Sequence, residues 1–568
     1  MDSKTVAESW LKSEIIDTHT KAAIETLKQS PDELHDAFYM DLEFGTGGLR
    51  GLMGPGTNRM NKYTVGMATQ GLANYLKLQF LGQQIKVAIA HDSRNLSDYF
   101  TEVAAGVFSA NGISVYLFPA LRPTPELSFA IRRLGCQSGV VITASHNPKE
   151  YNGFKAYWSD GGQLIAPHDK GVIGEVRKIT SFEQVKFEKN AALIEYLDDS
   201  MDEAYLDAIC ALSRTKALDK SIKIVFSPIH GTGITLVPRV LKKMGFEQVK
   251  IVEDQATPDG NFPTVVYPNP EENEAMKMAL QVAESWDADL VMATDPDSDR
   301  VGIGVKNHRG EFQLLNGNQT GALIIYYLLT MDKARGLKGN EFIAKTIVTT
   351  DLLSDIAAGF GVRHYETLTG FKFIAQLISE KEGKEIYIGG GEESYGYMIS
   401  DYVRDKDAVC SCAMLAEVCA WAKFQNKSLF DILLEIYRTY GFYMESLHSL
   451  TKRGEQGLKE IQQMMELRRK NPPKMIGGSE VIEMIDYQSG TKTWIKENRT
   501  EKIQFPVSNV LQFITADGSK ISLRPSGTEP KIKFYFSTKT ELANKEGYDE
   551  ALKVLKNKLD SLLRDTIG

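Results

Sequence analysis

Short runs of β-branched and other apolar residues recur along the chain, separated by segments of helical length. The clearest runs span 85–90, 139–142, 222–226 and 290–293, and each one stops at turn-forming residues such as Ser, Asn, Asp or Pro. Short apolar runs bounded by turn signals predict buried strands. Because helix-length segments lie between the runs, the pattern predicts α/β units with parallel or mixed sheets.

The two ends of the chain carry a different pattern. Residues 1–40 have helical character, and Ser30, Pro31 and Glu33 predict a capping box with proline at the first helical position. Near the carboxyl end, a charged helical segment at 455–470 is followed by strand patterns around 510–514 and 531–535 and by an amphipathic helix at 552–563. We therefore expect a helical lead-in packed on the first unit and an α+β unit at the end.

The length of the chain indicates several domains. A chain of 568 residues is too long for one ordinary hydrophobic core and predicts three to four domains. The changes of pattern suggest domain limits at 1–204, 205–320, 321–445 and 446–568. The first three units look alike in layout, although the sequence shows no repeat of fixed period.

The composition narrows the class of protein. A hydrophobic content of 42% and a charged content of 25% are typical of a soluble globular protein, and a net charge of −8 argues against a nucleic-acid partner. The first residues lack the apolar segment of a signal peptide, and no run of about 18 apolar residues occurs, so we expect a cytoplasmic location and no membrane partner. The five cysteines include no C-x-x-C pair, which indicates neither a disulfide framework nor a zinc site, and Cys410 and Cys412 suit core packing.

The first candidate for chemistry lies where the run at 139–142 ends. The next residues include Ser145, His146, Asn147 and Pro148, so a buried strand delivers a serine hydroxyl into a polar loop. Open parallel sheets bind ligands at the carboxyl ends of their strands. Ser, Asn and Pro are also ordinary turn residues, so a plain strand-to-turn junction is the alternative.

A group of aspartates follows the run at 290–293. Asp295, Asp297 and Asp299 are spaced so that a coiled loop can turn their carboxylates to one point, and hard oxygen ligands of this kind suit Mg²⁺. An EF-hand would need glycine and glutamate where Arg300 and Lys306 stand, which excludes that motif. An acidic surface turn is the remaining alternative.

Two further stretches offer polar groups suited to a phosphorylated sugar. Glu392 and Ser394 follow a strand and three glycines, and a carboxylate beside a hydroxyl can bind a diol. The stretch from Arg524 to Pro530 offers a guanidinium, two hydroxyls and a glycine, a combination that can hold a phosphate dianion. Taken alone, the first stretch could be a solvated triplet and the second an exposed β-turn.

These stretches, together with the glycine-rich stretch 44–51, occur in an order that resembles the α-D-phosphohexomutase superfamily, the phosphoglucomutases and phosphomannomutases. The resemblance spans about residues 40 to 540. It implies an α/β protein of four domains, in which three similar α/β domains with mixed sheets and a C-terminal α+β lid domain surround a central cleft. The four domains would in turn carry the phosphoserine, bind the metal, bind the sugar and bind the far phosphate.

The resemblance also implies roles for individual residues. Ser145 would be the nucleophile, with phosphoserine as its resting state, and its phosphate would complete a Mg²⁺ site formed by the three aspartates. The basic residues within the matched motifs would act beside it, with Lys406 as the general base if neighbouring cations lower its pKa. The implied catalytic residues are Ser145, His146, Lys406, Arg50 and Lys155. The implied substrate-binding residues are Thr46, Arg50, Arg300, Gly370, Lys372, Glu392, Ser394, Arg524, Ser526, Gly527, Thr528 and, less closely matched because many members carry arginine there, Lys533.

The stretches 44–50, 58–61 and 403–407 look most like the phosphoglucomutase-2 and phosphopentomutase branch. The resemblance favours interconversion of glucose 1-phosphate and glucose 6-phosphate through glucose 1,6-bisphosphate, the expected activator. The alternatives are a phosphopentomutase, a phosphomannomutase or a glucose 1,6-bisphosphate synthase. A magnesium-dependent phosphohydrolase and an inactive phosphosugar-binding protein are rivals from other classes. The expected partner is a small phosphosugar, and the expected state is a monomer or a weak homo-oligomer.

Overall fold

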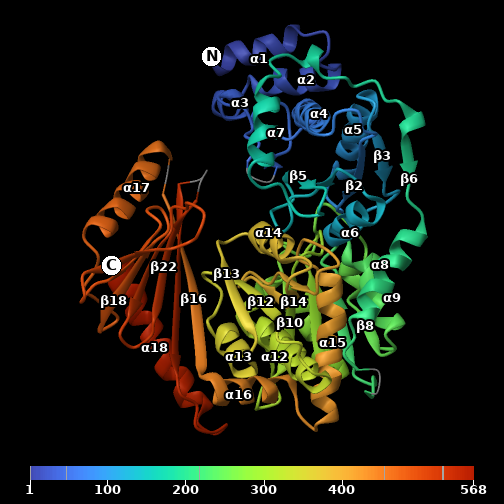
Figure 1. Ribbon diagram of the computed structural model, residues 1–568. Coiled ribbons are helices and arrows are strands. Elements are labelled where there is room, and N and C mark those ends of the chain that lie inside the picture. The colour runs from blue at the N-terminus through green and yellow to red at the C-terminus, as the bar shows by residue number, and fades with distance from the viewer. Residues whose placement is uncertain (1, 46–47, 216–217, 453, 527–529, 568) are drawn as a thin grey trace.

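The computed structural model describes residues 2–45, 48–215, 218–452, 454–526 and 530–567 (Figure 1). The described chain forms three α/β units with mixed sheets, followed by a fourth sheet that is antiparallel throughout. This confirms the fold class expected from the sequence. The domain limits given above remain predictions.

The lead-in is helical, as expected, and covers the outer side of the first unit (Figure 1). Its aromatic core includes Trp10 and Phe38, which pack edge to face against each other, and Tyr63 of helix α4. Ser30 precedes the third helix and Pro31 begins it, but the Ser30 side chain makes no capping hydrogen bond, so the predicted capping box is wrong. The helices are α1 (Ser3–Lys12), α2 (Thr18–Leu27) and α3 (Pro31–Phe38).

The first sheet has six strands in the order β1-β5-β4-β2-β3-β6. The glycine-rich stretch 44–51 leads into the edge strand β1, where a Cβ at Gly48 would meet the Phe154 carbonyl oxygen at 1.7 Å. The strands are β1 (Gly48–Leu52), β2 (Lys86–His91), β3 (Ser114–Leu117), β4 (Ser138–Ile142), β5 (Tyr151–Trp158) and β6 (Ile194–Tyr196). The helices are α4 (Lys62–Gln79), α5 (Ser97–Ala110), α6 (Thr124–Leu134), α7 (His168–Arg177) and α8 (Asp199–Ala211), with 3-10 turns at Phe182–Gln184 and Ala191–Leu193.

The second and third sheets have the orders β11-β10-β9-β7-β8 and β13-β12-β14-β15. The second unit contains β7 (Ile224–Ser227), β8 (Val249–Ile251), β9 (Leu290–Thr294), β10 (Val301–Lys306) and β11 (Phe312–Leu315), with α9 (Gly233–Lys243), α10 (Glu253–Ala256) and α11 (Asn273–Trp286). The third contains β12 (Glu341–Thr346), β13 (Arg363–Thr367), β14 (Ile386–Gly391) and β15 (Tyr397–Ile399), with α12 (Gly317–Arg335), α13 (Leu352–Phe360), α14 (Phe371–Lys381), α15 (Ala408–Phe424) and α16 (Leu429–Tyr440).

The three units share one strand topology, which confirms the similar layouts expected from the sequence. In each sheet, three parallel strands are followed in the chain by a fourth that turns back antiparallel to the third, in the spatial order fourth, third, first, second. The turns between third and fourth strands are therefore equivalent. They are the segments 143–150, 295–300 and 392–396, and they carry Ser145, the three aspartates and Glu392 with Ser394.

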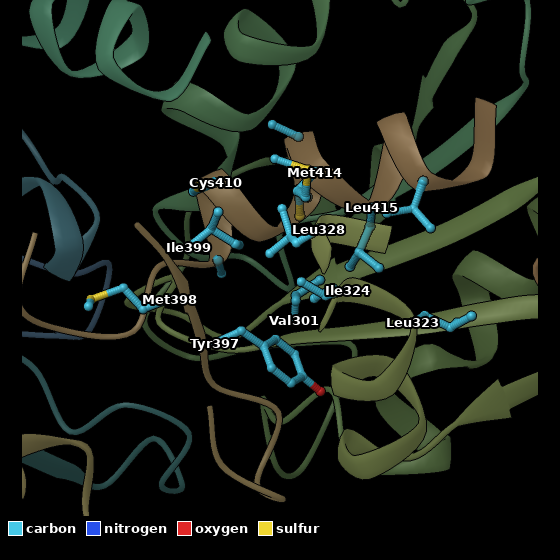
Figure 2. Close-up of a cluster of buried hydrophobic side chains, with 14 of the residues drawn as sticks. Val301, Leu323, Ile324, Leu328, Tyr397, Met398, Ile399, Cys410, Met414 and Leu415 are labelled. Carbon is cyan, nitrogen blue, oxygen red and sulfur yellow. The ribbon is translucent and has the colours of Figure 1, made fainter. Parts of the chain in front are cut away.

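A continuous apolar core joins the first three units. Helix α15 lies in its middle and is buried on all sides, and it contacts α9 of the second unit and β15 of the third. Figure 2 shows this region, with side chains from β10, α12, β15 and α15 packed together: Val301, Leu323, Ile324, Leu328, Tyr397, Met398, Ile399, Cys410, Met414 and Leu415. Cys410 and Cys412 are free thiols within this core, as predicted.

The fourth sheet has the order β16-β23-β22-β21-β18-β19-β20, with β17 paired to β18. Most of it packs on a core of its own, and a small apolar cluster joins it to the third unit. The fourth unit also enters the continuous core described above, through Phe442, Tyr443, Leu542, Tyr548 and Leu555. Its strands are β16 (Phe442–Thr451), β17 (Met475–Ile476), β18 (Ser479–Asp486), β19 (Thr491–Trp494), β20 (Arg499–Lys502), β21 (Leu511–Thr515), β22 (Lys520–Pro525) and β23 (Lys531–Thr540), and its helices are α17 (Gly454–Lys470) and α18 (Tyr548–Ile567). None of the helices in the described ranges is long and apolar enough to cross a membrane.

Candidate active site

The three equivalent turns meet at one place and share a backbone feature. Ser145, Ser298 and Tyr395, one in each turn, adopt positive φ angles of 53°, 53° and 67°. Residues other than glycine rarely adopt this conformation, and when they do, the surrounding contacts hold them there. The turns are therefore fixed in shape by their surroundings.

Ser145 is buried and points at the aspartate turn. Its Oγ donates a hydrogen bond of 2.9 Å to Oδ2 of Asp295 and lies 3.2 Å from Nδ1 of His146, while Thr143 Oγ1 accepts a hydrogen bond from the Ser145 amide. Burial and then the charges of Arg300 and Arg50 hold the pKa of His146 well below its usual value. The imidazole is therefore neutral, and one of its nitrogens can donate to a group on Ser145.

Arg94, at the end of β2, holds the serine turn in place. Its guanidinium is buried and donates to the carbonyl oxygens of Ser145 (2.6 Å), Asn147, Pro148 (2.8 Å) and Tyr151 (3.0 Å). The planar guanidinium of arginine can donate to several acceptors at once, and the ammonium of lysine could not reproduce this geometry. The sequence showed this residue only as part of a polar stretch at a strand end, and its role was missed because its partners are backbone atoms.

Two neighbours support the Arg94 guanidinium. Asp92 Oδ2 lies 3.3 Å from its Nε, and the Phe262 ring of the second unit lies under it at 5.0 Å. A buried charge needs a partner and an enclosing surface of this kind. The serine turn is therefore fixed by residues from two units.

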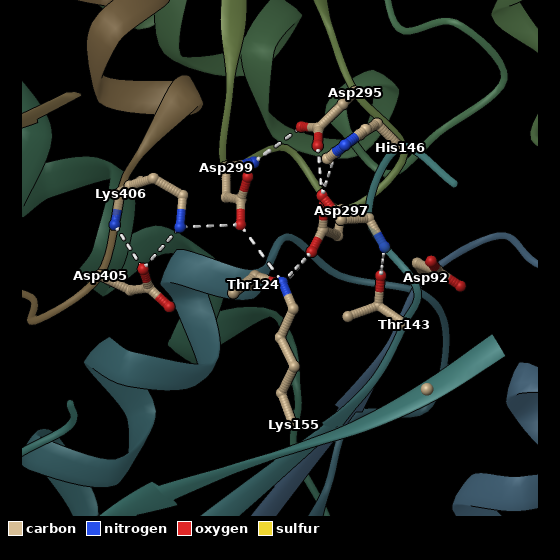
Figure 3. Close-up of polar contacts among 12 residues, drawn as sticks. Asp92, Thr124, Thr143, His146, Lys155, Asp295, Asp297, Asp299, Asp405 and Lys406 are labelled. Carbon is tan, nitrogen blue, oxygen red and sulfur yellow. Dashed lines mark hydrogen bonds and ion pairs between the residues drawn. The ribbon is translucent and has the colours of Figure 1, made fainter. Parts of the chain in front are cut away.

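Asp295, Asp297 and Asp299 form a buried cluster in which one oxygen from each lies within 4.8 Å of the others (Figure 3). Asp295 Oδ1 accepts hydrogen bonds from the Asp299 and Arg300 amides. Oδ1 of Asp297 and Oδ1 of Asp299 are buried and lack any hydrogen-bond partner within the described structure. Two unpartnered carboxylate oxygens beside Asp295 fit a cation that takes oxygen ligands, since buried acceptors are otherwise satisfied.

Lys155 and Lys406 balance the charge of the cluster (Figure 3). Nζ of Lys155 lies 2.7 Å from Asp297 and 3.3 Å from Asp299, and Nζ of Lys406 lies 3.2 Å from both Asp299 and Asp405. Burial acts to lower the pKa of Lys406, but the charges of Asp299 and Asp405 outweigh it and raise the pKa. The expectation that neighbouring cations lower this pKa is therefore wrong, because carboxylates surround the lysine.

The third turn lies beside the second. Oε1 of Glu392 accepts a hydrogen bond of 2.9 Å from the amide of Gly370, which precedes α14, and the amide of Val301 donates to the carbonyl oxygen of Tyr395. Nη1 of Arg300 lies 2.6 Å from Glu271. Glu392, which the sequence predicts to bind sugar, thus lies next to the aspartate turn, residues 295–300.

The residues predicted to bind the far phosphate belong to the fourth sheet. Arg524 on β22 lies opposite Lys533 on β23. Burial and then the charges of Arg524 and Lys531 lower the pKa of Lys533, against the opposing charges of Glu393 and Glu271. These interactions bring the fourth sheet close to the third turn.

The described structure thus brings most of the predicted residues together. Arg50 reaches the serine turn through Asn147 (3.5 Å), and burial lowers the pKa of Lys372 against the charge of Asp169 in the first unit. Ser526 follows the end of β22, and its amide donates to the Lys531 carbonyl. Three predicted contacts, Thr46, Gly527 and Thr528, lie outside the described residues.

Comparisons with known proteins agree with this architecture. Models of domains I, II and III of the phosphoglucomutase/phosphomannomutase family, each described as alpha/beta/alpha, match residues 41–183, 203–310 and 316–440. A phosphoglucomutase of Staphylococcus aureus is 38% identical over 516 residues, which cover 90% of this chain and 92% of that protein.

Two solved structures share the fold. A putative phosphomannomutase from Thermus thermophilus superposes with a TM-score of 0.68 at 21% identity, covering 93% of this chain and 98% of the other. The open form of the Paramecium phosphoglucomutase parafusin gives 0.68 at 19% identity, covering 92% and 95%. The three matched domains and the long alignment with a curated relative show that the chain belongs to the phosphoglucomutase/phosphomannomutase family.

Proposed function

We propose that the protein is a phosphosugar mutase that interconverts glucose 1-phosphate and glucose 6-phosphate. The observation that carries the proposal is the buried Ser145 hydroxyl, 2.9 Å from Asp295 at the edge of a three-carboxylate cluster. Phosphoryl transfer needs a nucleophile, a cation and fixed donors around the phosphate, and candidates for all three lie side by side here. The name of the Staphylococcus aureus relative supports glucose phosphate as the substrate.

The cation is proposed to be Mg²⁺, held by Asp295, Asp297 and Asp299, with an oxygen of the Ser145 phosphate as the fourth ligand. The residues fit because all are hard oxygen donors and two of the carboxylate oxygens are buried without partners. When bound, the cation would neutralise charge on the phosphate during transfer.

The chain's own residues would serve both ends of the sugar in turn. Phosphorylated Ser145 gives its phosphate to the free hydroxyl of a sugar monophosphate, and the resulting bisphosphate returns its other phosphate to Ser145. Glu392 and Ser394 hold adjacent sugar hydroxyls, while Arg524 and Lys533 hold the phosphate that is not being transferred. Because either end must reach Ser145, these residues must accept the sugar in two orientations.

Water must be kept from the phosphoserine between the two transfers. We propose that the fourth unit closes as a lid, since most of its sheet packs on a core of its own while Phe442, Tyr443, Leu542, Tyr548 and Leu555 anchor it to the continuous core. Lys406 is proposed to take the proton of the attacking hydroxyl. It can do so only in a state in which Asp299 and Asp405 no longer hold its charge.

To test the proposal, isomerisation of glucose 1-phosphate, mannose 1-phosphate and ribose 1-phosphate is measured separately with the purified protein, Mg²⁺ and catalytic glucose 1,6-bisphosphate. We expect fast isomerisation of the glucose ester and a loss of about 10⁴-fold or more in Ser145→Ala, which lacks the nucleophile. Ser138→Ala is the matched control, because this serine is buried at the other end of the preceding strand and its hydroxyl donates to the Tyr157 carbonyl.

Other outcomes of this assay would indicate a different activity. A preference for the ribose or mannose ester would make the protein a phosphopentomutase or a phosphomannomutase. Accumulation of glucose 1,6-bisphosphate from a phosphoryl donor would favour a synthase. Release of inorganic phosphate without isomerised sugar would favour a phosphohydrolase, and binding without turnover an inactive phosphosugar-binding protein.

A further inference from the structure

The metal loop, residues 295–300, is held at a seam between three units. Three successive carbonyl oxygens accept hydrogen bonds from three different parts of the chain. Pro296 accepts from the amide of Thr232 in the second unit (2.8 Å), Asp297 from that of Thr124 in the first (2.9 Å), and Ser298 from that of Ala408 in the third (3.1 Å). The loop's shape therefore depends on all three units.

Thr124 makes a second contact, with the side chain of an aspartate of the loop. It is the first residue of α6, is fully buried, and its Oγ1 donates a hydrogen bond of 3.1 Å to Oδ2 of Asp297. The same oxygen accepts a hydrogen bond of 2.7 Å from Nζ of Lys155. With Oδ2 engaged by two donors, the buried and unpartnered Oδ1 is the oxygen left to face a cation.

We propose that Thr124 is a positioning residue that selects which oxygen of Asp297 meets the cation; this inference rests on the metal site of the proposed function. Lys155 alone cannot fix the carboxylate, because its flexible side chain is shared with Asp299. Thr124 is β-branched and starts a helix, so its hydroxyl has few rotamers. Residues that hold a metal ligand in orientation contribute to metal affinity without touching the metal.

The position of Thr124 at the N-terminus of α6 further fixes Asp297. The amide of Thr124 donates to the Asp297 backbone while the hydroxyl donates to its side chain, so two bonds from one residue fix the main chain and carboxylate together. The positive end of a helix dipole also favours a carboxylate placed at it. The seam between the first and second units thereby takes part in the metal site.

The test is Thr124→Val, which removes the hydroxyl but keeps the branched shape and the backbone amide. The dissociation constant of Mn²⁺, measured by electron paramagnetic resonance, and that of Mg²⁺, measured by calorimetry, should rise by about 10-fold or more. Thr124→Ser should return them to within about twofold of the wild type, because the hydroxyl is restored. Turnover at saturating Mg²⁺ should fall less than the affinity does.

Thr69→Val is the matched control, since Thr69 is equally buried and its hydroxyl bonds the Val65 carbonyl within α4. It should leave both dissociation constants unchanged. If Thr124→Val fails to fold, Thr124→Ala removes the hydroxyl without keeping bulk at the seam, and the same loss of affinity is expected.

The outcomes separate the inference from the proposed function. If the wild type binds Mn²⁺ and Mg²⁺, and a folded Thr124 variant without the hydroxyl binds them equally well, the inference is overturned and the mutase proposal stands. If the wild type binds neither cation, the metal site of the proposed function fails and the inference fails with it.

Discussion

Two regions of the site differ in how they are attached to the rest of the protein. The serine turn and the aspartate turn stand on a continuous core that spans three units. Arg94 of the first unit bonds the backbone of the serine turn, and residues of three units bond the backbone of the aspartate turn. Arg524 and Lys533 stand instead on the fourth sheet, most of which packs on a core of its own. The fourth unit is anchored to the continuous core through Phe442, Tyr443, Leu542, Tyr548 and Leu555. Elsewhere it meets the third unit through a smaller apolar cluster and through polar contacts such as Lys520 with Asp351 at 2.7 Å.

The difference separates two tasks. Groups that react must be held within a fraction of an ångström, and a continuous core with interlocked turns provides this. A group that only holds the far phosphate can stand on a part that moves, and a small interface with polar contacts opens more readily than a core. If this comparison is right, changes in the first region should affect turnover, and changes in the second should affect binding.

The largest effect is expected at Arg94. Arg94→Lys keeps a positive charge beside Asp92 but cannot donate to four carbonyl oxygens at once, so the serine turn should relax. We expect kcat to fall by about 10²-fold, the cost of roughly an ångström of misplacement, with little change in KM. Steady-state kinetics and the rate of phosphoenzyme formation from glucose 1,6-bisphosphate measure this.

Arg214→Lys is the control for the Arg94 variant. Arg214 is also largely buried, and donates to the Leu212 carbonyl and to Asp332 away from the site. It should lower the melting temperature without lowering kcat. A folded Arg94→Lys protein with normal turnover would show that the serine turn keeps its shape without the guanidinium. The claim that turnover depends on these backbone hydrogen bonds would then be wrong.

A smaller effect of the opposite kind is expected at Arg524. Arg524→Ala would remove the charge-assisted hydrogen bonds proposed for the far phosphate, so KM for glucose 1-phosphate should rise roughly 10- to 50-fold while kcat changes less. Arg499→Ala, on the exposed β19–β20 hairpin of the same sheet, is the control and should change neither constant. If kcat fell while KM stayed the same, Arg524 would act in turnover, as the serine and aspartate turns do, and not in substrate binding.

The sequence predicted the reactive residues of the serine and aspartate turns better than the residues that hold those turns in place. Apolar runs located the strands, and the polar residues at their ends, Ser145 and the three aspartates, meet because equivalent turns of three similar units converge. Arg94 and Thr124 were missed because one bonds backbone carbonyls and the other bonds across a seam. A residue pattern records side-chain type and spacing, and it does not record which backbone or neighbouring unit a side chain will meet.

The charge state of Lys406 was mispredicted for a related reason. The sequence places it among basic residues of the matched motifs, whereas the fold surrounds its ammonium with Asp299 and Asp405. A pKa depends on the sum of charges within a few ångströms, and these charges come from separate segments of the chain. Ser30 likewise has the right residue type for a cap, and only the backbone decides that its side chain is not used.

The smallest effect is expected at the interface of the fourth sheet, where Glu445 on β16 faces the third unit. Burial and then the charge of Asp351 raise the pKa of Glu445 to about 7, against hydrogen bonds from Thr350 and Asn318. In the unfolded chain the carboxyl releases its proton near its ordinary value of 4.5, so the folded state binds the proton more tightly. The contribution of this carboxyl to stability is therefore complete below about pH 4.5 and is lost as the pH rises through about 7.

Glu445→Gln, which stays neutral, should remove that loss. At pH 8 the variant should melt about 1–2 °C above the wild type, a shift of order 1 kcal/mol for a partly exposed group, and the difference should shrink at pH 5.5. Glu546→Gln, at an exposed position of the same unit, should show no such dependence. Because most of the fourth sheet packs on a core of its own, the shift should be larger in the melting of the fourth unit than in that of the other three. An equal shift throughout the unfolding profile would mean that the anchor through Phe442, Tyr443, Leu542, Tyr548 and Leu555 makes the two regions unfold as one.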